Sequence, residues 1–219
     1  MEARGVSDGY HDSRLVQDAR RGVVWQALWR YYFRHRISAR DCVLDLGCGY
    51  GDFINSVVAD RRLALDRWPQ MHEHLAAGVE GHVGPVTDLA WIEDGGVDFA
   101  FASNLFEHVT QDDFGATLDA LRGKLSPRGV LTILQPNYRY AYREYFDDYT
   151  HIAVYSHISL ADFLTAKGWE VLEVKPRFLP LTVKSRLPVS PVLIGAYLRS
   201  PFKPMGKQML ISARPGPRP

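Results

Sequence analysis

An acidic residue followed by three regularly spaced glycines is the clearest chemical feature of this chain. Asp45 ends an apolar stretch, and Gly47, Gly49 and Gly51 then occupy every second position. Glycine permits positive φ, and its missing side chain lets a ligand lie directly against the main chain. We expect a helix over residues 53–58 to follow, adding N–H donors and partial positive charge. The pattern predicts a nucleotide-type cofactor site at the carboxyl edge of a parallel sheet.

The glycine spacing also narrows the class of ligand. D-x-G-x-G-x-G is neither the G-x-G-x-x-G of dinucleotide enzymes nor a phosphate-binding loop ending in Lys-[Ser/Thr]. By itself the loop could be a tight turn in any α/β protein. In this context it resembles motif I of the class I S-adenosylmethionine-dependent methyltransferases. The resemblance implies that Asp45 takes the ammonium of the cofactor, with Gly47, Cys48, Gly49 and Gly51 against its methionine part.

Two later acids extend the expected cofactor site. Asp66, with Arg67 beside it, ends the next strand, where nucleotide-binding α/β folds place a carboxylate on the ribose hydroxyls. The alternative for Asp66 is a helix N-cap, because Pro69 follows as if opening a helix. In the resembling family the third loop carries an acid near adenine, and Asp88, followed by Leu89, is the best substitute here.

Strands and helices alternate along the rest of the chain. Apolar patterns predict further strands at 62–65, 81–89, 97–102, 130–134, 169–175 and 208–213. Helices are expected at 13–35, at 111–125 after a Thr110 cap, and at 160–167 after a Ser159 cap. The predicted fold is therefore α/β, a Rossmann-like seven-stranded, mostly parallel sheet with helices on both faces.

We divide the chain into three parts. The family resemblance implies that residues 1–40 form a helical lid over the cofactor and residues 41–214 the methyltransferase domain, and we expect residues 215–219 to be a disordered tail. Within the domain, a long loop at 135–158 should cover the active site, and 176–206 is an apolar insertion. Core packing, dimerisation or contact with a lipid-linked acceptor could each explain this insertion.

A histidine is the expected base. Methyl transfer is an in-line displacement at the sulfonium carbon, so the protein must orient the acceptor and remove the proton of a hydroxyl. Three histidines follow the fourth and fifth strands, and His151 is favoured because Asp148 could orient it. His108, in an E-H-V stretch, lines the cofactor side in the resembling family or shapes a turn. His157 lies closer to a helix cap.

The long loop also supplies the expected acceptor contacts. Asn137, Tyr138, Tyr142 and Tyr149 offer flat faces and hydrogen-bonding groups, which suit a sugar ring, a phenol or a flat heterocycle. A purely structural role in covering the domain is the alternative. The loop resembles that of bacterial methyltransferases from polysaccharide and glycolipid pathways, which implies O-methylation of a sugar hydroxyl. O- or N-methylation of a small secondary metabolite is the competing function.

Composition excludes several other classes. The chain has 219 residues, 46% of them hydrophobic, and a formal net charge of +1. Near-neutral charge argues against a nucleic-acid substrate. A base-methylating enzyme would have Asn-Pro-Pro after the fourth strand, where this chain has Ser103-Asn104-Leu105-Phe106. We expect Asn104 and Leu105 to line the cofactor cleft instead. A non-catalytic scaffold would typically lack the first glycines or acids.

The expected surroundings of the protein follow from what the sequence lacks. It has no membrane-length apolar run and no metal-ligand spacing, and Cys42 and Cys48 are too far apart along a strand to pair. We therefore expect a metal-independent cytoplasmic protein, monomer or homodimer, with no integral membrane association and at most peripheral membrane contact.

Overall fold

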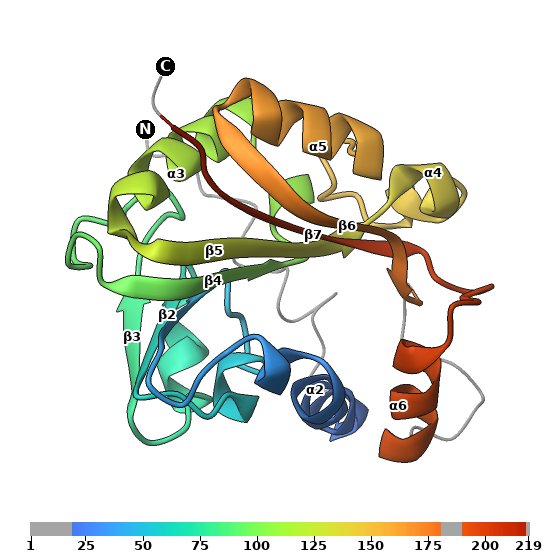
Figure 1. Ribbon diagram of the computed structural model, residues 1–219, viewed down its shortest axis with the longest axis horizontal. Helices are drawn as coiled ribbons and strands as arrows, with labels where there is room; N and C mark the ends of the chain where they lie inside the picture. The colour runs from blue at the N-terminus through green and yellow to red at the C-terminus, as the bar shows by residue number, and fades with distance from the viewer. Residues whose placement is uncertain (1–18, 181–189, 218–219) are drawn as a thin grey trace.

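The computed structural model describes residues 19–180 and 190–217, arranged around one seven-stranded sheet (Figure 1). The strand order is β3-β2-β1-β4-β5-β7-β6. Neighbours from β3 to β5 pair in parallel, whereas β7 runs antiparallel to both β5 and β6. The strands are β1 (Cys42–Leu46), β2 (Arg61–Asp66), β3 (Val79–Val83), β4 (Val97–Ser103), β5 (Leu125–Pro136), β6 (Trp169–Leu179) and β7 (Gln208–Pro215). The predicted sheet is confirmed.

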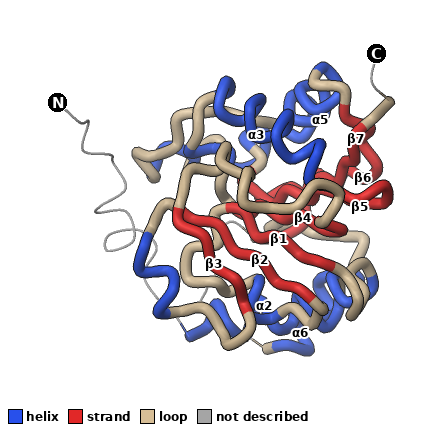
Figure 2. Tube along the Cα trace, turned by 90° about the vertical axis from the view of Figure 1, so that its left-hand side faces the viewer, coloured by secondary structure: helices blue, strands red, loops and turns tan. Residues whose placement is uncertain are grey.

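Helices cover both faces of this sheet (Figure 2). On one face lie α3 (Gln111–Lys124) and α5 (His157–Ala166), and on the other lie α2 (Ala19–Tyr31) and α6 (Pro191–Arg199). The short α4 (Tyr138–Ala141) follows β5. Short 3-10 helices complete the described residues: η2 (Phe33–His35), η3 (Ile54–Ser56), η4 (Pro69–Glu73), η5 (Phe106–His108) and η6 (Tyr145–Asp147).

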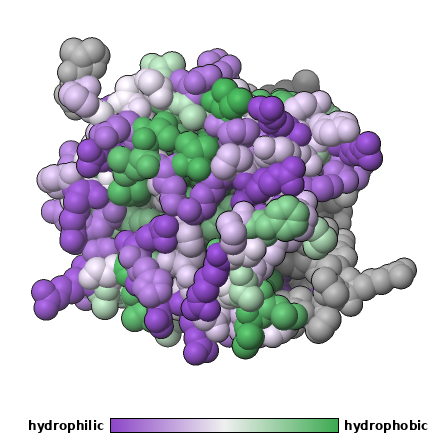
Figure 3. Space-filling model, turned by 45° about the vertical axis from the view of Figure 1, so that its right-hand side comes forward, coloured by the Kyte–Doolittle hydropathy of each residue, from purple (hydrophilic) through white to green (hydrophobic). Residues whose placement is uncertain are grey.

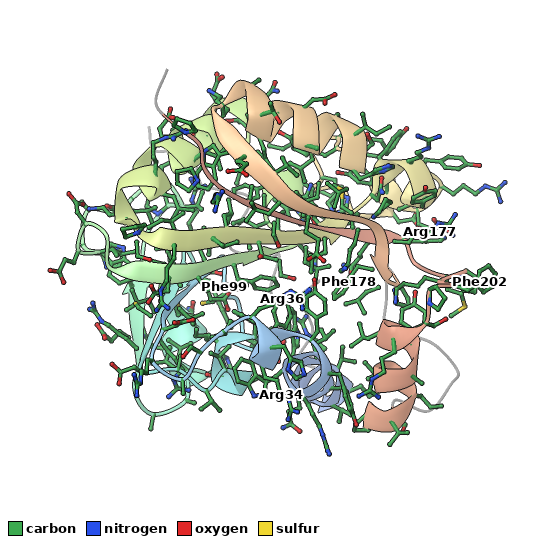
Figure 4. The ribbon with its side chains drawn as sticks, viewed as in Figure 1. Arg34, Arg36, Phe99, Arg177, Phe178 and Phe202 are labelled. Carbon is green, nitrogen blue, oxygen red and sulfur yellow. The ribbon has the colours of Figure 1, made fainter. Side chains whose placement is uncertain are left out.

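Alternating side chains of the strands build two hydrophobic cores. In β4, Ala100 and Ala102 face the core under α3 and α5, whereas Phe99 and Phe101 face the core under α2. This period of two is what a strand buried on both faces requires. Phe178 of β6 extends into the second core (Figure 4), with its ring centroid 4.7 Å from that of Tyr32.

The predicted helix over residues 53–58 is wrong. Only η3 forms there, and Val57 already has extended backbone angles. The hydroxyl of Ser56 donates to the carbonyl of Asp52 at 2.8 Å, a local bond that competes with helix formation, and two β-branched residues follow it. The glycine loop therefore lacks the α-helix N-terminus that was expected to add positive charge.

The N-terminal helix and the insertion pack together. Of the expected helix 13–35, residues 13–18 lie outside the described residues, and α2 ends at Tyr31. A Cβ atom placed on Gly195 of α6 would come within 2.8 Å of the Tyr31 ring, so the two helices are in close contact. The described part of the insertion thus covers α2. Nε of Arg21 in α2 also pairs with Asp52 at 2.8 Å, beside the glycine loop.

Two element ends differ from expectation. The last helix on the first face begins at His157 because Ser156, not Ser159, is its N-cap; Ser159 completes a capping box three residues later. Residues 215–217 of the expected disordered tail are ordered, since β7 reaches Pro215 and the Gly216 amide donates to the Gly168 carbonyl at 2.9 Å. Residues 218–219 lie outside the described residues.

Candidate active site

The glycine loop closes tightly between β1 and β2. Gly47, Gly49 and Gly51 all have positive φ, at 69°, 51° and 69°. The amides of Gly47 and Cys48 donate to the Leu65 carbonyl at 2.8 and 3.1 Å, which ties the loop to β2. The positive φ of Gly47 favours glycine, and a Cβ at this position would also lie 2.8 Å from Leu105 Cδ1, which would have to shift.

Asp45 is a buried carboxylate in an acidic setting. Burial, followed by the charge of Asp66, raises the pKa of Asp45 well above its usual value, although the Ile54 amide donates a hydrogen bond to it. Among the described residues no salt bridge includes Asp45. A bound ammonium group would supply the missing charge, which fits the amino-acid end of S-adenosylmethionine.

Asp66 lies at the end of β2 and contacts the same loop. One carboxylate oxygen accepts from the Gly49 amide at 2.7 Å and the other from the Trp68 amide at 2.9 Å. The second bond is the local turn expected of an acid preceding η4, so the capping alternative is present in the structure. Each oxygen keeps a lone pair that a ribose hydroxyl could use. Arg67 is exposed.

The adenine side is less well defined. Asp88 is exposed after β3, with its carboxylate 3.7 Å from Nε2 of His82. The side chain of Leu89, predicted to contact the cofactor, is instead part of the core beneath α3. Only its main chain remains for a ligand contact.

Asn104 and Leu105 connect the two sides of the cleft. Asn104 has φ of 49°, and among the described residues it is the one non-glycine with positive φ. Its amide donates to the Leu134 carbonyl, and its side-chain oxygen accepts from Gln208 of β7 at 2.8 Å. These bonds hold the strained turn that places Leu105 against Gly47.

His108 and His151 meet beyond the carboxyl ends of β4 and β5. Their ring centroids are 4.8 Å apart. Nδ1 of His108 lies 3.2 Å from the Thr150 carbonyl, and Nδ1 of His151 contacts the Tyr145 carbonyl. Burial lowers the pKa of His108 to about 4, so this ring is neutral above that pH.

Asp148 does not orient His151 through a hydrogen bond, although the charges of His108 and His151 both help to lower the pKa of Asp148. Asp148 instead accepts from the Thr150 hydroxyl at 2.6 Å and from the Thr150 amide at 3.0 Å. The same hydroxyl lies 2.9 Å from Nδ1 of His108. Asp148 therefore reaches His108 through Thr150, because its position two residues earlier favours a local turn with Thr150 over a contact with the next ring.

Glu107 completes this group, and the sequence analysis assigned it no role. Its side chain is fully buried, and neither carboxylate oxygen has a hydrogen-bond partner. Burial raises the pKa of Glu107 to about 8. The signal in the sequence was a glutamate between Phe106 and His108, directly after a strand expected to be buried. Glutamate is almost never fully buried unless it is paired with another group.

The long loop keeps only some of its predicted acceptor contacts. Asn137 is fully buried, caps α4 and donates to the Pro176 carbonyl at 2.8 Å, so its predicted role in binding the acceptor is wrong. Tyr138 is half-buried, and its ring centroid lies 5.2 Å from that of Tyr145. Tyr142 and Tyr149 are 53% and 64% exposed and remain accessible to an acceptor.

Comparison with known proteins agrees with this geometry. A family model described as a methyltransferase domain matches residues 19–174. A SAM-dependent methyltransferase from Archaeoglobus fulgidus is 19% identical at a TM-score of 0.66, over 88% of this chain and 93% of that one. The DhpI–SAH complex is 21% identical at a TM-score of 0.56, over 91% of this chain and 97% of that one. A Burkholderia thailandensis 1,6-didemethyltoxoflavin-N1-methyltransferase is 19% identical at a TM-score of 0.60, over 95% of this chain and 84% of that one. No curated protein sequence matches the chain.

The family match spans most of the chain and includes the glycine loop, Asp66 and the histidine pair. The structural neighbours share the fold, and two of them are complexes with S-adenosylhomocysteine, the demethylated cofactor. The buried Asp45 and the glycine turn beside it fit that cofactor. The chain therefore belongs to the methyltransferase-domain family and is an S-adenosylmethionine-dependent methyltransferase.

Proposed function

We propose that this enzyme transfers the methyl group of S-adenosylmethionine to a hydroxyl group of a small-molecule or glycan acceptor, with sugars as the preferred class. The observation that carries the proposal is the histidine pair beyond β4 and β5. The backbone links this pair to the cofactor loop, since Leu105 packs on Gly47 and its carbonyl accepts from the His108 amide at 2.9 Å.

The cofactor is held by the first half of the sheet. Asp45 takes the ammonium, Asp66 the ribose hydroxyls, and the main chain around Asp88 the adenine side. The bound cofactor supplies an electrophilic methyl group and a good leaving group, so the protein contributes orientation and proton removal.

Proton removal falls to His151. A neutral imidazole that donates from Nδ1 to a carbonyl carries its lone pair on Nε2, and the contact with the Tyr145 carbonyl favours this tautomer. The acceptor proton moves to that nitrogen while the O–CH₃ bond forms and the S–CH₃ electron pair returns to sulfur. His108 is the poorer base at neutral pH because its pKa is about 4.

Exposed aromatic side chains support a sugar acceptor. Tyr142, Phe146 and Tyr149 are each more than half exposed on the loop that follows β5. The C–H face of a sugar stacks on such rings, while its hydroxyls need the polar groups between them. An open hollow of about 440 Å³ is lined by Thr110, Gln111 and residues 152–155, which closely follow the two histidines in the sequence.

Methyl-labelled cofactor offered with a panel of glycosides, phenols and amines tests the proposal. We expect label on a sugar hydroxyl, and its loss in His151→Ala with cofactor affinity intact. Label on phenols or amines alone would contradict the sugar assignment. Full activity of His151→Ala would contradict the assigned base.

A further inference from the structure

Three side chains with metal-ligand chemistry converge beyond β4 and β5. Glu107 and His108 come from η5, and His151 comes from the loop after η6. One ligand atom of each lies within 4.8 Å of the other two. The Glu107 carboxylate is 4.0 Å from Nε2 of His108, which is too long for a hydrogen bond, and both its oxygens are buried without a partner. The cluster thus contains an uncompensated buried acid.

The surrounding main chain fixes the orientation of this cluster. The Glu107 carbonyl accepts from the amides of Ile152 and Ala153 at 2.9 and 3.1 Å, which ties the two loops together. Each histidine also has its Nδ1 at a backbone carbonyl. Such contacts set the tautomer and ring direction of metal-bound histidines and direct Nε2 toward the ion.

We propose that Glu107, His108 and His151 bind a divalent transition-metal ion of the Zn²⁺ type. Two imidazoles and one carboxylate are a donor set for Zn²⁺, Mn²⁺, Fe²⁺ or Co²⁺, whereas Mg²⁺ and Ca²⁺ prefer oxygen ligands. Metal–ligand bonds of about 2.0–2.2 Å place tetrahedral ligand atoms roughly 3.4 Å apart. The three side chains therefore draw closer when the ion enters.

Three protein ligands leave a coordination position open, as catalytic metal sites do. This role of the ion rests on the proposed function, and it changes the part of His151 from base to ligand. An acceptor hydroxyl bound at the open position is acidified by the ion and releases its proton to water. The O–CH₃ bond then forms as the S–CH₃ electron pair returns to sulfur. The ion thereby supplies the positive charge that Glu107 lacks.

Metal binding can be tested apart from catalysis. The full chain is stripped with chelator and titrated with Co²⁺, monitored by visible absorption, and with Zn²⁺, monitored by calorimetry. We expect saturable binding of one ion per chain, weakened at least about tenfold in Glu107→Gln and in His151→Ala. His35→Ala is the matched control, because His35 is exposed on η2 outside the cluster and its loss should leave affinity unchanged. Circular dichroism verifies that each variant is folded.

Failure of this inference can be distinguished from failure of the proposed function. Absence of saturable binding, or binding that survives both cluster substitutions, overturns the metal site. If the stripped enzyme also methylates a hydroxyl at the full rate, the proposed function stands without the ion. If the ion binds as expected but the loaded enzyme methylates only amines, the metal site stands and the hydroxyl acceptor is overturned.

Discussion

The loops after β1 and β2, the proposed cofactor side, present main chain and carboxylates, whereas the loops after β4 and β5, the proposed acceptor side, present imidazoles and tyrosines. The first set is closely packed: Leu105 lies where a Gly47 side chain would be, and Asp66 holds the Gly49 amide. The second set exposes aromatic rings and leaves a buried acid unpaired. If the proposed sites are right, the closely packed side suits a single invariant ligand, and the other offers chemistry that different acceptors could use.

The exposed surface alternates between apolar and polar areas. In Figure 3 the green apolar areas lie as separate patches between purple polar ones. Phe202, beyond α6, is 74% exposed (Figure 4). No helix in the described part of the chain has the length and apolar character to cross a membrane.

Removal of His151 should have the largest effect and should affect only the acceptor side. We expect His151→Ala to lower turnover about 10²–10⁴-fold, the usual contribution of a group that promotes proton removal. Cofactor affinity, measured by calorimetry, should not change. His35→Ala serves as the control, and a parallel fall in cofactor affinity would show that the two sides are not separate.

Asp45→Asn should have the next largest effect, now confined to the cofactor side. Loss of a charge-assisted bond to ammonium should weaken S-adenosylmethionine binding about 10–100-fold. Because the folded-state pKa of Asp45 is raised, its ionisation costs stability as pH rises above the ordinary aspartate pKa. Cofactor-free Asp45→Asn should therefore gain stability over the wild type with increasing pH, as followed by urea unfolding. Equal pH dependence of the two proteins would contradict a strained buried carboxylate.

Gly47→Ala tests how tightly the cofactor side is packed. Positive φ alone costs about 1–2 kcal/mol for a residue with a Cβ atom, and contact with Leu105 adds to this. Gly22→Ala in α2 is the matched control, because nothing lies within 4 Å of its new Cβ and alanine should stabilise the helix by about 0.5–1 kcal/mol. Chemical denaturation measures both, and equal effects would remove the argument for close packing.

The exposed tyrosines should show the smallest effect. Tyr149→Ala should raise the KM for the acceptor by about 2–10-fold, the equivalent of one lost aromatic contact, with kcat and thermal stability unchanged. Phe202→Ala removes an equally exposed ring elsewhere and should leave KM unaltered. A loss of stability in Tyr149→Ala would instead assign that ring a structural role.

Regular patterns made the fold predictable. The positive φ of the three loop glycines and the Thr110 cap each depend on neighbours close in sequence, and each was found where expected. The helix after the glycine loop failed because a side-chain bond of Ser56 and two valines outweighed the usual strand–helix rhythm.

The acceptor side was harder to predict because a local turn redirected one side chain and contacts with distant residues redirected others. Asp148 accepts a hydrogen bond from Thr150 rather than from His151, and the side-chain amide of Asn137 donates to the Pro176 carbonyl, which leaves it buried away from an acceptor. The unpaired state of Glu107 follows from how η5 meets residues 151–153, 44 or more positions later, and no local pattern reports it. Tertiary packing decides such roles.

The position of β7 has a consequence for how the enzyme is made. This strand lies between β5 and β6, although both precede it in the chain. During synthesis β5 and β6 therefore wait as unpaired edges until β7 leaves the ribosome, and such edges invite aggregation. Gln208, which steadies Asn104 at the cleft, arrives with the same strand. The nascent protein thus completes its sheet and the contact between Gln208 and Asn104 only when β7 pairs, and chaperone protection would matter most before that step.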